Sequence, residues 1–268
     1  MKVYISADIE GVAGVVHGDQ IGPQGGGEYQ KARLQMTREV NSVVEAALAL
    51  GASEVLVNDG HANQRNILIE ELHEDALLLA GSPKPLAMME GIDASFDAAV
   101  FVGYHARAGT SGTMSHTMSG GAVANIYING QVMGETALNA ALAGHFGVPV
   151  VLVTGDNRLT GEAQGALGLV ETVTVKDVIW HTAAKCIHPR KVLRMIREAA
   201  EKALSDISQY NPLIIPGPVT IDVEYLRKAM VEMAARVPGY TQVGELTLRK
   251  ECADYLEAYR WMRMMVVG

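Results

Sequence analysis

Residues 2–11 of the 268-residue chain read KVYISADIEG, and this stretch carries the strongest indication of both fold and chemistry. Lys2–Ala7 follow the pattern of a short strand, and the acidic residues Asp8 and Glu10 come directly after it. In extended geometry, side chains that are two residues apart project to the same face. The chain therefore begins with a strand that delivers two carboxylates to one place.

Downstream of this strand, segments of strand length alternate with segments of helical periodicity. Residues 28–50 have apolar positions at helical spacing, and Gly51 follows as a stop signal. Further strands are predicted over 54–57, 76–80, 98–102, 122–128, 150–153 and 172–178, and further helices over 135–146 and 158–167. This alternation predicts an α/β fold of three layers, α/β/α, around a largely parallel sheet.

A stretch with three prolines, at residues 211–218, is the best candidate for a domain boundary. It follows an amphipathic helix predicted over 189–207. After it come the predicted strand 219–223, helix 226–235, strand 242–248 and helix 252–265. We therefore expect an α/β metal-binding catalytic domain over 1–210 and a smaller α+β unit over 211–268. The length of the chain allows the smaller unit to be separate or to be packed into the same domain.

The composition excludes one class of protein and suggests a state of assembly. Acidic residues outnumber basic ones by 30 to 22, for a formal net charge of −8, whereas a nucleic-acid-binding protein would carry a basic patch. Charged residues make up 19% of the chain, below the roughly 25% of an ordinary soluble domain. This low charge favours a homo-oligomer in which part of the surface is covered by other subunits.

The sequence also predicts the compartment. Its first residues lack the basic and apolar regions of a secretory signal, and the densest apolar run, 148–153, is far shorter than the ~20 residues that cross a bilayer. Cys186 and Cys252 are far apart and lie in no CxxC motif, so we expect buried thiols rather than a disulfide. The expected protein is cytoplasmic and has no membrane partner.

Residues that can bind a metal follow three of the predicted strands. Asp8 and Glu10 come after the first, His61 after the second and His105 after the strand 98–102. The carboxyl ends of parallel strands lie along one edge of a sheet, where ligands usually bind. Two carboxylates and two imidazoles suit zinc or another first-row divalent ion, which would also relieve repulsion between the carboxylates. Each residue has an ordinary alternative: a cap or turn for Asp8, a loop position for His61 and a half-buried aromatic for His105.

Two further residues are candidates for the same site. His116 lies in the polar, Gly-containing segment 106–120, where it is either a proton shuttle or a surface residue. Glu135 falls at the predicted start of a helix, where it either complements the helix dipole or points a carboxylate into the pocket. The residues alone leave both alternatives open.

Together these motifs resemble a known family. The run SADIEG at residues 6–11 is similar to the SxDxEG signature of the zinc-dependent D-aminopeptidases associated with bacterial dipeptide-transport operons. The similarity continues in order through NDGH at 58–61, GYH at 103–105, SHT at 115–117, NG at 129–130 and GET at 134–136. It covers the first half of the chain, whereas the C-terminal third is similar only in its general pattern.

The resemblance implies a dinuclear zinc site, with two Zn²⁺ ions in each subunit. The metal ligands that it implies are Asp8, Glu10, His61, His105 and Glu135. His116 takes the position of the family's proposed catalytic histidine. The resemblance also implies a ring-like homodecamer whose active sites face an internal channel, which agrees with the low charge of the chain.

We therefore expect a zinc metallo-aminopeptidase that uses a metal-activated water to remove the N-terminal residue, a D-amino acid, from short peptides. A carboxylate would bridge the two metals, and of Asp8 and Glu10 we expect Asp8. His116 would act as general base, or would stabilise the tetrahedral intermediate and protonate the leaving amine. The same residues also suit a dinuclear metallohydrolase of another amide or a phosphoester, or a non-catalytic oligomeric protein that binds metal or peptide.

Overall fold

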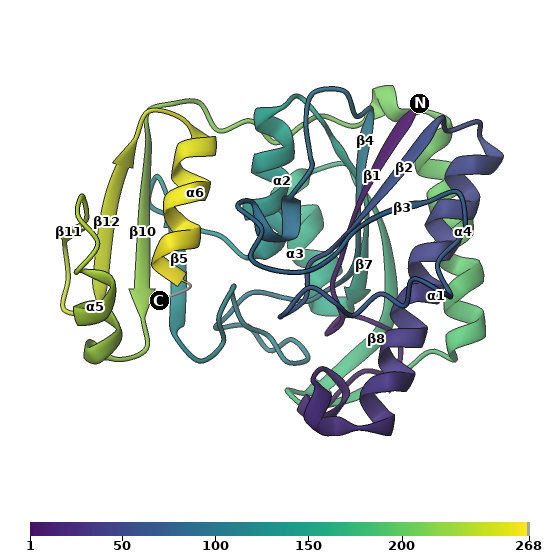
Figure 1. Ribbon diagram of the computed structural model, residues 1–268, viewed down its shortest axis with the longest axis horizontal. Coiled ribbons are helices and arrows are strands. Elements are labelled where there is room, and N and C mark those ends of the chain that lie inside the picture. The colour runs from purple at the N-terminus through teal and green to yellow at the C-terminus, as the bar shows by residue number, and fades with distance from the viewer. Residues whose placement is uncertain (267–268) are drawn as a thin grey trace.

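The computed structural model describes residues 1–266 and contains a large, mainly parallel sheet and a small antiparallel one (Figure 1). The large sheet has the strand order β3-β2-β1-β4-β7-β8-β9. Its strands are β1 (Lys2–Ala7), β2 (Glu54–Asp59), β3 (Leu77–Leu79), β4 (Ala98–Tyr104), β7 (Val150–Asp156), β8 (Glu171–Trp180) and β9 (Ala183–Cys186). All neighbours in this sheet are parallel except β8 and β9. The chain runs outward from β1 in one direction through β2 and β3 and in the other through β4, β7 and β8, so the sheet has its switch point at β1.

Helices cover both faces of the large sheet, which confirms the three-layer prediction. Helices α1 (Gly27–Ala49) and α4 (Pro189–Ser205) lie on one face, and α2 (Glu135–His145) and α3 (Asn157–Leu167) lie on the other (Figure 1). Side chains of β1 alternate between the two cores: Val3 and Ile5 belong to the cluster with α1 and α4, and Tyr4 to the cluster with α2. Strands that are buried on both faces explain the continuous apolar runs in the sequence.

The small sheet combines strands from two distant parts of the chain. Its order is β11-β12-β10-β5-β6, and every pair is antiparallel. The strands are β5 (Val123–Ile128), β6 (Gln131–Val132), β10 (Val219–Tyr225), β11 (Thr241–Gln242) and β12 (Thr247–Cys252), accompanied by the helices α5 (Lys228–Ala234) and α6 (Tyr255–Val266). The boundary near residue 210 stays a prediction, and the structure adds that two strands of the small sheet precede it.

Three details of the chain differ from the sequence prediction. The predicted strand 242–248 is wrong, because residues 243–246 form the turn between β11 and β12. The strand β12 then continues to Cys252, so the last helix begins at Tyr255 rather than at Cys252. Only one of the two free thiols is buried, since Cys186 is exposed at the end of β9. Short antiparallel strands of mixed polarity explain the first two errors, because each is too short to show a period.

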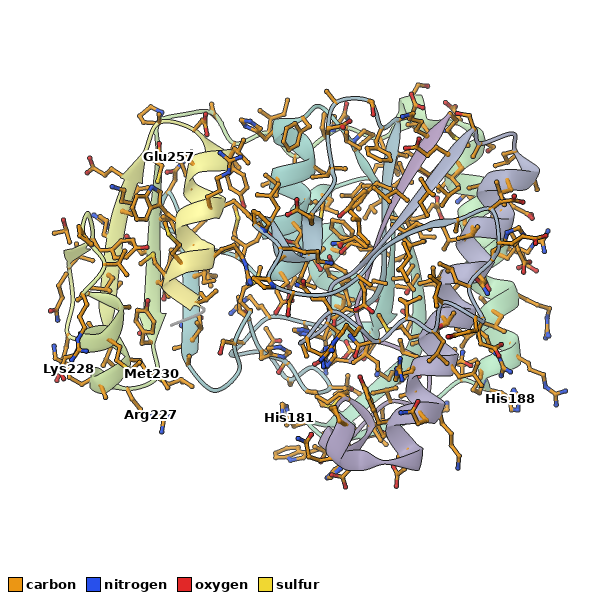
Figure 2. The ribbon with its side chains drawn as sticks, in the orientation of Figure 1. His181, His188, Arg227, Lys228, Met230 and Glu257 are labelled. Atoms are coloured by element: carbon orange, nitrogen blue, oxygen red, sulfur yellow. The ribbon has the colours of Figure 1, made fainter. Side chains whose placement is uncertain are left out.

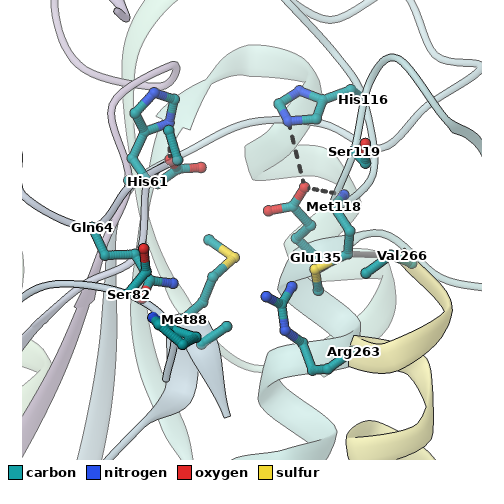
Figure 3. A pocket seen from close by; sticks show the side chains of 15 residues that line it. His61, Gln64, Ser82, Met88, His116, Met118, Ser119, Glu135, Arg263 and Val266 are labelled. Carbon is teal, nitrogen blue, oxygen red and sulfur yellow. Dashed lines mark hydrogen bonds and ion pairs between the residues drawn. The ribbon is translucent and has the colours of Figure 1, made fainter. Parts of the chain in front are cut away.

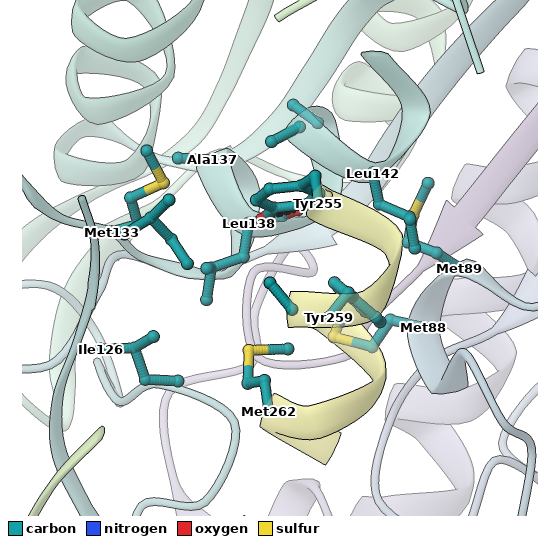
Figure 4. Close-up of a cluster of buried hydrophobic side chains, with 14 of the residues drawn as sticks. Met88, Met89, Ile126, Met133, Ala137, Leu138, Leu142, Tyr255, Tyr259 and Met262 are labelled. Atoms are coloured by element: carbon teal, nitrogen blue, oxygen red, sulfur yellow. Dashed lines mark hydrogen bonds between the residues drawn. The ribbon is translucent and has the colours of Figure 1, made fainter. Parts of the chain in front are cut away.

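Helix α6 packs between the small sheet and α2, which joins the two parts of the molecule (Figure 4). A chain of buried hydrogen bonds crosses this contact. The Tyr259 hydroxyl donates to Asn139 Oδ1 at 2.7 Å, and Asn139 Nδ2 donates to the Tyr104 hydroxyl at 2.9 Å. Tyr104 in turn lies 2.6 Å from Ser6 Oγ on β1. Because every member is buried and has a partner, the network fixes α6 relative to the carboxyl end of β1.

None of the helices within residues 1–266 combines the length and the apolar character that crossing a membrane requires.

Candidate metal centre

The carboxyl ends of three neighbouring strands and the first residue of α2 bring five of the predicted residues together. Asp8 and Glu10 follow β1, His61 follows β2, His105 follows β4, and Glu135 begins α2. All five are buried. Because β2, β1 and β4 are adjacent and parallel, residues that are far apart in the sequence meet at one edge of the sheet.

Two glycines allow the loops after β1 and β4 to approach each other. A Cβ atom on Gly11 would lie 1.8 Å from the Tyr104 carbonyl oxygen, so no larger residue fits there. Gly103 has φ +71°, a conformation that favours glycine, and a Cβ on it would lie 2.3 Å from the Asp8 carbonyl oxygen. The glycine of the SADIEG motif therefore lets Asp8 and Glu10 sit beside His105.

The two oxygens of the Asp8 carboxylate face different imidazoles. Oδ1 lies 3.1 Å from His61 Nδ1, and Oδ2 lies 3.5 Å from His105 Nε2. His61 Nδ1 is also 2.9 Å from Glu10 Oε2, and His105 Nε2 is 3.4 Å from Glu135 Oε1. Asp8 is thus placed between two pairs, one of Glu10 with His61 and one of Glu135 with His105.

In His61 and His105, the ring nitrogen that faces away from the carboxylates is hydrogen-bonded to a backbone carbonyl. His61 Nε2 lies 2.8 Å from the Ile21 oxygen, and His105 Nδ1 lies 3.0 Å from the Ala106 oxygen. A carbonyl only accepts, so each of these nitrogens carries the proton and donates it. In the neutral ring, the nitrogen that faces the carboxylates then holds a lone pair. Histidine ligands of metals have this arrangement, in which a second hydrogen bond fixes the tautomer and the ring.

Two buried atoms at the centre of the cluster have no hydrogen-bond partner. They are Glu10 Oε2 and His105 Nε2, and both point toward neighbouring ligand-type atoms. An unsatisfied buried polar atom is costly, and bound cations would give each of these two atoms a partner. The residues Asp8, Glu10 and His105 offer ligand atoms within 4.8 Å of one another, as do His105, His116 and Glu135. The donor set of oxygen and imidazole nitrogen suits zinc.

The buried carboxylates of the cluster also favour a bound proton or cation. Burial and the neighbouring charge of Glu10 raise the pKa of Asp8 to about 7. Burial alone would lower the pKa of His105, but the carboxylates of Glu135, Asp8 and Glu10 together raise that pKa to about 10. For Glu135, burial raises the pKa, whereas His105, His116 and the Met118 N–H together lower it to about 2. The carboxylates therefore hold protons on the imidazoles unless a divalent cation replaces them.

His116 stands beside this cluster on the loop after β4. Its ring stacks on His105 with the centroids 4.0 Å apart, and its Nδ1 lies 3.0 Å from the Met114 oxygen. Its Nε2 is 3.8 Å from Glu135 Oε1, while Met118 N donates to the same oxygen at 2.6 Å. The His116 side chain is 25% exposed, unlike those of the other two histidines. It can exchange protons with solvent from a position next to the cluster.

The cluster opens into a cavity of about 390 Å³ (Figure 3). Asp8, His61, His116 and Glu135 line one part of it, and Met88 and Met118 line its walls. Across the cavity from the two histidines lies Arg263 of α6 (Figure 3). The sequence did not predict this residue as part of the site, because its position depends on the packing of the last helix against α2.

His188, which is close to Cys186 in the sequence, lies away from the cavity. It caps the N-terminus of α4, where its Nδ1 accepts from Arg190 N at 3.2 Å (Figure 2). Neither Cys186 nor His188 lines the cavity.

Comparison with known proteins gives concordant matches. A family model described as D-aminopeptidase, Peptidase_M55, matches residues 1–264. A D-aminopeptidase of Bacillus subtilis (strain 168) is 40% identical over 266 residues, which cover 99% of this chain and 96% of the relative. The fold is similar to the solved structure of the Zn-dependent D-aminopeptidase DppA from Bacillus subtilis, described as a self-compartmentalizing protease. That match has a TM-score of 0.96 and 39% identity, and it covers 100% of this chain and 97% of the other.

Proposed function

This chain belongs to the D-aminopeptidase family of peptidases, and from that membership we propose that it is a zinc-dependent aminopeptidase that removes N-terminal D-amino acids from short peptides. The observation that carries the proposal is the position of Asp8, whose two oxygens face His61 and His105 at 3.1 and 3.5 Å. A carboxylate between two imidazoles, each flanked by a further carboxylate, suits a pair of metal ions.

Asp8 would contribute to both zinc sites, with Glu10 and His61 holding one zinc ion and His105 and Glu135 holding the other. Zinc held by these residues would activate a water molecule at neutral pH and polarise the scissile carbonyl group. The backbone carbonyls of Ile21 and Ala106 keep the two imidazoles in the neutral tautomer that can ligate.

His116 is the residue that we assign to proton transfer. Its Nδ1 is held by the Met114 carbonyl, so Nε2 is the atom that can accept a proton from water or return one to the leaving amine. The Nε2 atom faces the cavity beside Glu135, and the exposure of the ring connects it to bulk solvent. An N-terminal peptide amine would occupy the same end of the cavity, where the carboxylates and metals can bind it.

The first test combines metal analysis with two dipeptides. We expect close to two zinc ions per subunit and hydrolysis of D-Ala-D-Ala at least about tenfold faster, in kcat/KM, than hydrolysis of L-Ala-L-Ala. Removal of zinc with a chelator should abolish the activity, and added zinc should restore it. A protein that binds zinc but cleaves phosphoesters or other amides would be another metallohydrolase, and bound peptide without product would indicate a binding protein.

For assembly and location we propose a homo-oligomer, with a decamer as the expected size, in the cytoplasm. The exposed free thiol of Cys186 is compatible with a reducing compartment. The end of β8, just before the turn to β9, carries two large exposed apolar residues, Ile179 at 70% and Trp180 at 75% exposure. Apolar residues that are adjacent and this exposed favour a contact with a second copy of the chain.

The turn that follows β8 is hydrogen-bonded to the loop that carries His116. The next residue, His181, lies at the edge of the molecule (Figure 2), and its carbonyl oxygen accepts from Met114 N at 2.8 Å. The Met114 carbonyl in turn holds His116 Nδ1. A subunit contact at Trp180 would therefore restrain the loop that carries His116.

Replacement of Trp180 by Asp is expected to reduce the oligomer to smaller species and to lower kcat about tenfold, because a charge in a subunit contact is left without a partner. Light scattering coupled to size-exclusion chromatography measures the mass. The Trp180→Phe variant keeps an apolar ring and should retain both size and activity. If the Trp180→Asp variant has the same mass as the wild type, the end of β8 does not form a subunit contact.

A further inference from the structure

Arg263 points from α6 into the cavity, and residues 1–266, which the structure describes, offer no partner for its charge. In Figure 3 its guanidinium group is directed toward the space between Met88 and Glu135. Its Nε atom is buried and has no hydrogen-bond partner in the part of the chain that the structure describes. The side chain forms no hydrogen bond or ion pair with any of the described residues 1–266. Glu135, an acidic residue of the same lining, is instead engaged by His105, His116 and Met118.

A guanidinium group in this position is suited to an anionic ligand. A charge that is partly removed from water without a partner is costly, so the cavity favours a ligand that brings a negative group. The planar donors of arginine match the two oxygens of a carboxylate, and such pairs are stronger than hydrogen bonds between neutral groups. The lining also includes the apolar side chains of Met88, Met118 and Val266.

The helix holds Arg263 at a fixed place relative to the metal centre. The Tyr255 hydroxyl donates to the Leu138 carbonyl at 2.8 Å, and the Tyr259 hydroxyl donates to Asn139 at 2.7 Å. Both acceptors lie on α2, the helix that begins with Glu135. Met262, next to Arg263, is buried in the core that α2 and α6 share (Figure 4). The arginine and the first residue of α2 therefore belong to one packed unit.

We propose that Arg263 binds the α-carboxylate at the C-terminus of the substrate. This inference rests on the proposed aminopeptidase function, and it defines the substrate class as short peptides with a free C-terminal carboxylate. An extended chain spans roughly 3.5 Å per residue, so a peptide of two or three residues carries its amine and its carboxylate about 7 to 11 Å apart. The metal centre and Arg263 face each other across one cavity and bind the two charged ends, while the apolar walls contact the side chains.

The test compares D-Ala-D-Ala with its C-terminal amide, which lacks the negative charge. For the wild type we expect kcat/KM for the free acid to exceed that for the amide by about 10- to 100-fold, the range of one charged hydrogen-bonded pair. In Arg263→Ala this ratio should fall to about 1 to 3, mainly through a higher KM for the free acid. Arg263→Lys should restore part of the ratio, since it returns the charge without the planar donors.

The matched control is Arg260→Ala, because Arg260 lies one turn earlier on α6 but is exposed and does not line the cavity. This variant should keep the wild-type ratio. Equal loss on both substrates in Arg263→Ala would show a structural role in α6 and overturn the inference, as would a wild type that cleaves the acid and the amide equally. If the wild type cleaves neither substrate with zinc bound, the aminopeptidase function itself fails. The zinc content and the thermal unfolding of each variant separate these outcomes from misfolding.

Discussion

Replacement of His116 by Ala is expected to lower kcat on D-Ala-D-Ala on the order of 10³-fold while the zinc content stays at the wild-type level. The reason is that His116 is the imidazole of the cluster that remains partly exposed, with Nε2 3.8 Å from Glu135 and Nδ1 fixed by the Met114 carbonyl. The loss of this group removes a proton acceptor next to the reacting water without removing an oxygen or nitrogen from the buried set around Asp8.

Metal analysis of the purified variant, together with steady-state kinetics, distinguishes catalysis from ligation. His145→Ala is a suitable control, since His145 lies exposed at the end of α2 and should leave both quantities unchanged. Because His116 stacks on His105, it is also close enough to the cluster to be a metal ligand. If the Ala variant loses zinc along with activity, His116 is a ligand beside His105 and Glu135, and the proton acceptor must be sought elsewhere in the cavity.

The second large effect is expected at Asp8. The Asp8→Asn variant should lose most of its bound zinc and at least about 10³-fold of its activity, because an amide offers one oxygen in place of two and turns an NH₂ group toward one imidazole. The two Asp8 oxygens contact different histidines, so a single substitution affects both halves of the site.

The same variant should unfold, in the absence of metal, at a temperature no lower than the metal-free wild type. Burial and the charge of Glu10 raise the pKa of Asp8 to about 7, which means that the ionised carboxylate is disfavoured in the folded protein. The amide carries no charge and removes that repulsion. Lost zinc with retained stability would therefore show that Asp8 serves the metal and not the fold. Calorimetry on chelated samples provides the measurement.

Asp59 offers the matched contrast for this experiment. It is buried at the end of β2, two residues before His61, but its Oδ2 accepts from the backbone N–H of Ile67 at 2.7 Å and its Oδ1 from Asn66 at 2.8 Å. Its carboxylate is already satisfied within the fold. Asp59→Asn should thus lower the thermal stability by disturbing this loop while zinc remains bound, the reverse of the pattern at Asp8. A loss of zinc without a loss of stability would place Asp59 in the metal site instead.

The sequence predicted the large sheet well because its strands are buried on both faces. β1 has the predicted bounds, and the polar residues that follow β1, β2 and β4 converge because parallel strands end at one edge. The grouping of Asp8, Glu10, His61 and His105 could therefore be expected before their contacts were known, whereas the place of Glu135 beside them was implied only by the family resemblance. The roles of these residues as ligands, and of His116 in proton transfer, stay predictions for the experiments above.

Other parts of the site depend on contacts that no local pattern contains. The pairing of β5 with β10 joins residues almost 100 positions apart, and neither strand indicates its partner. Arg263 stands among methionines in a helix whose orientation is set by Tyr255 and Tyr259. The need for glycine at position 11 is likewise evident only from the distance to the Tyr104 carbonyl. These features could not be predicted because they depend on packing between residues that are far apart in the sequence.

The pairing of β5 with β10 has a consequence for recombination between related enzymes. A C-terminal segment exchanged at the proline-rich stretch would bring a foreign β10 against the native β5, and the cross-strand neighbours Ile126 and Val223 would no longer be matched. The helix that bears Arg263 would then rest on a mismatched sheet. A functional chimera has to exchange residues 123–132 together with the C-terminal segment. The small sheet can therefore be exchanged only when both segments of the chain come from the same enzyme.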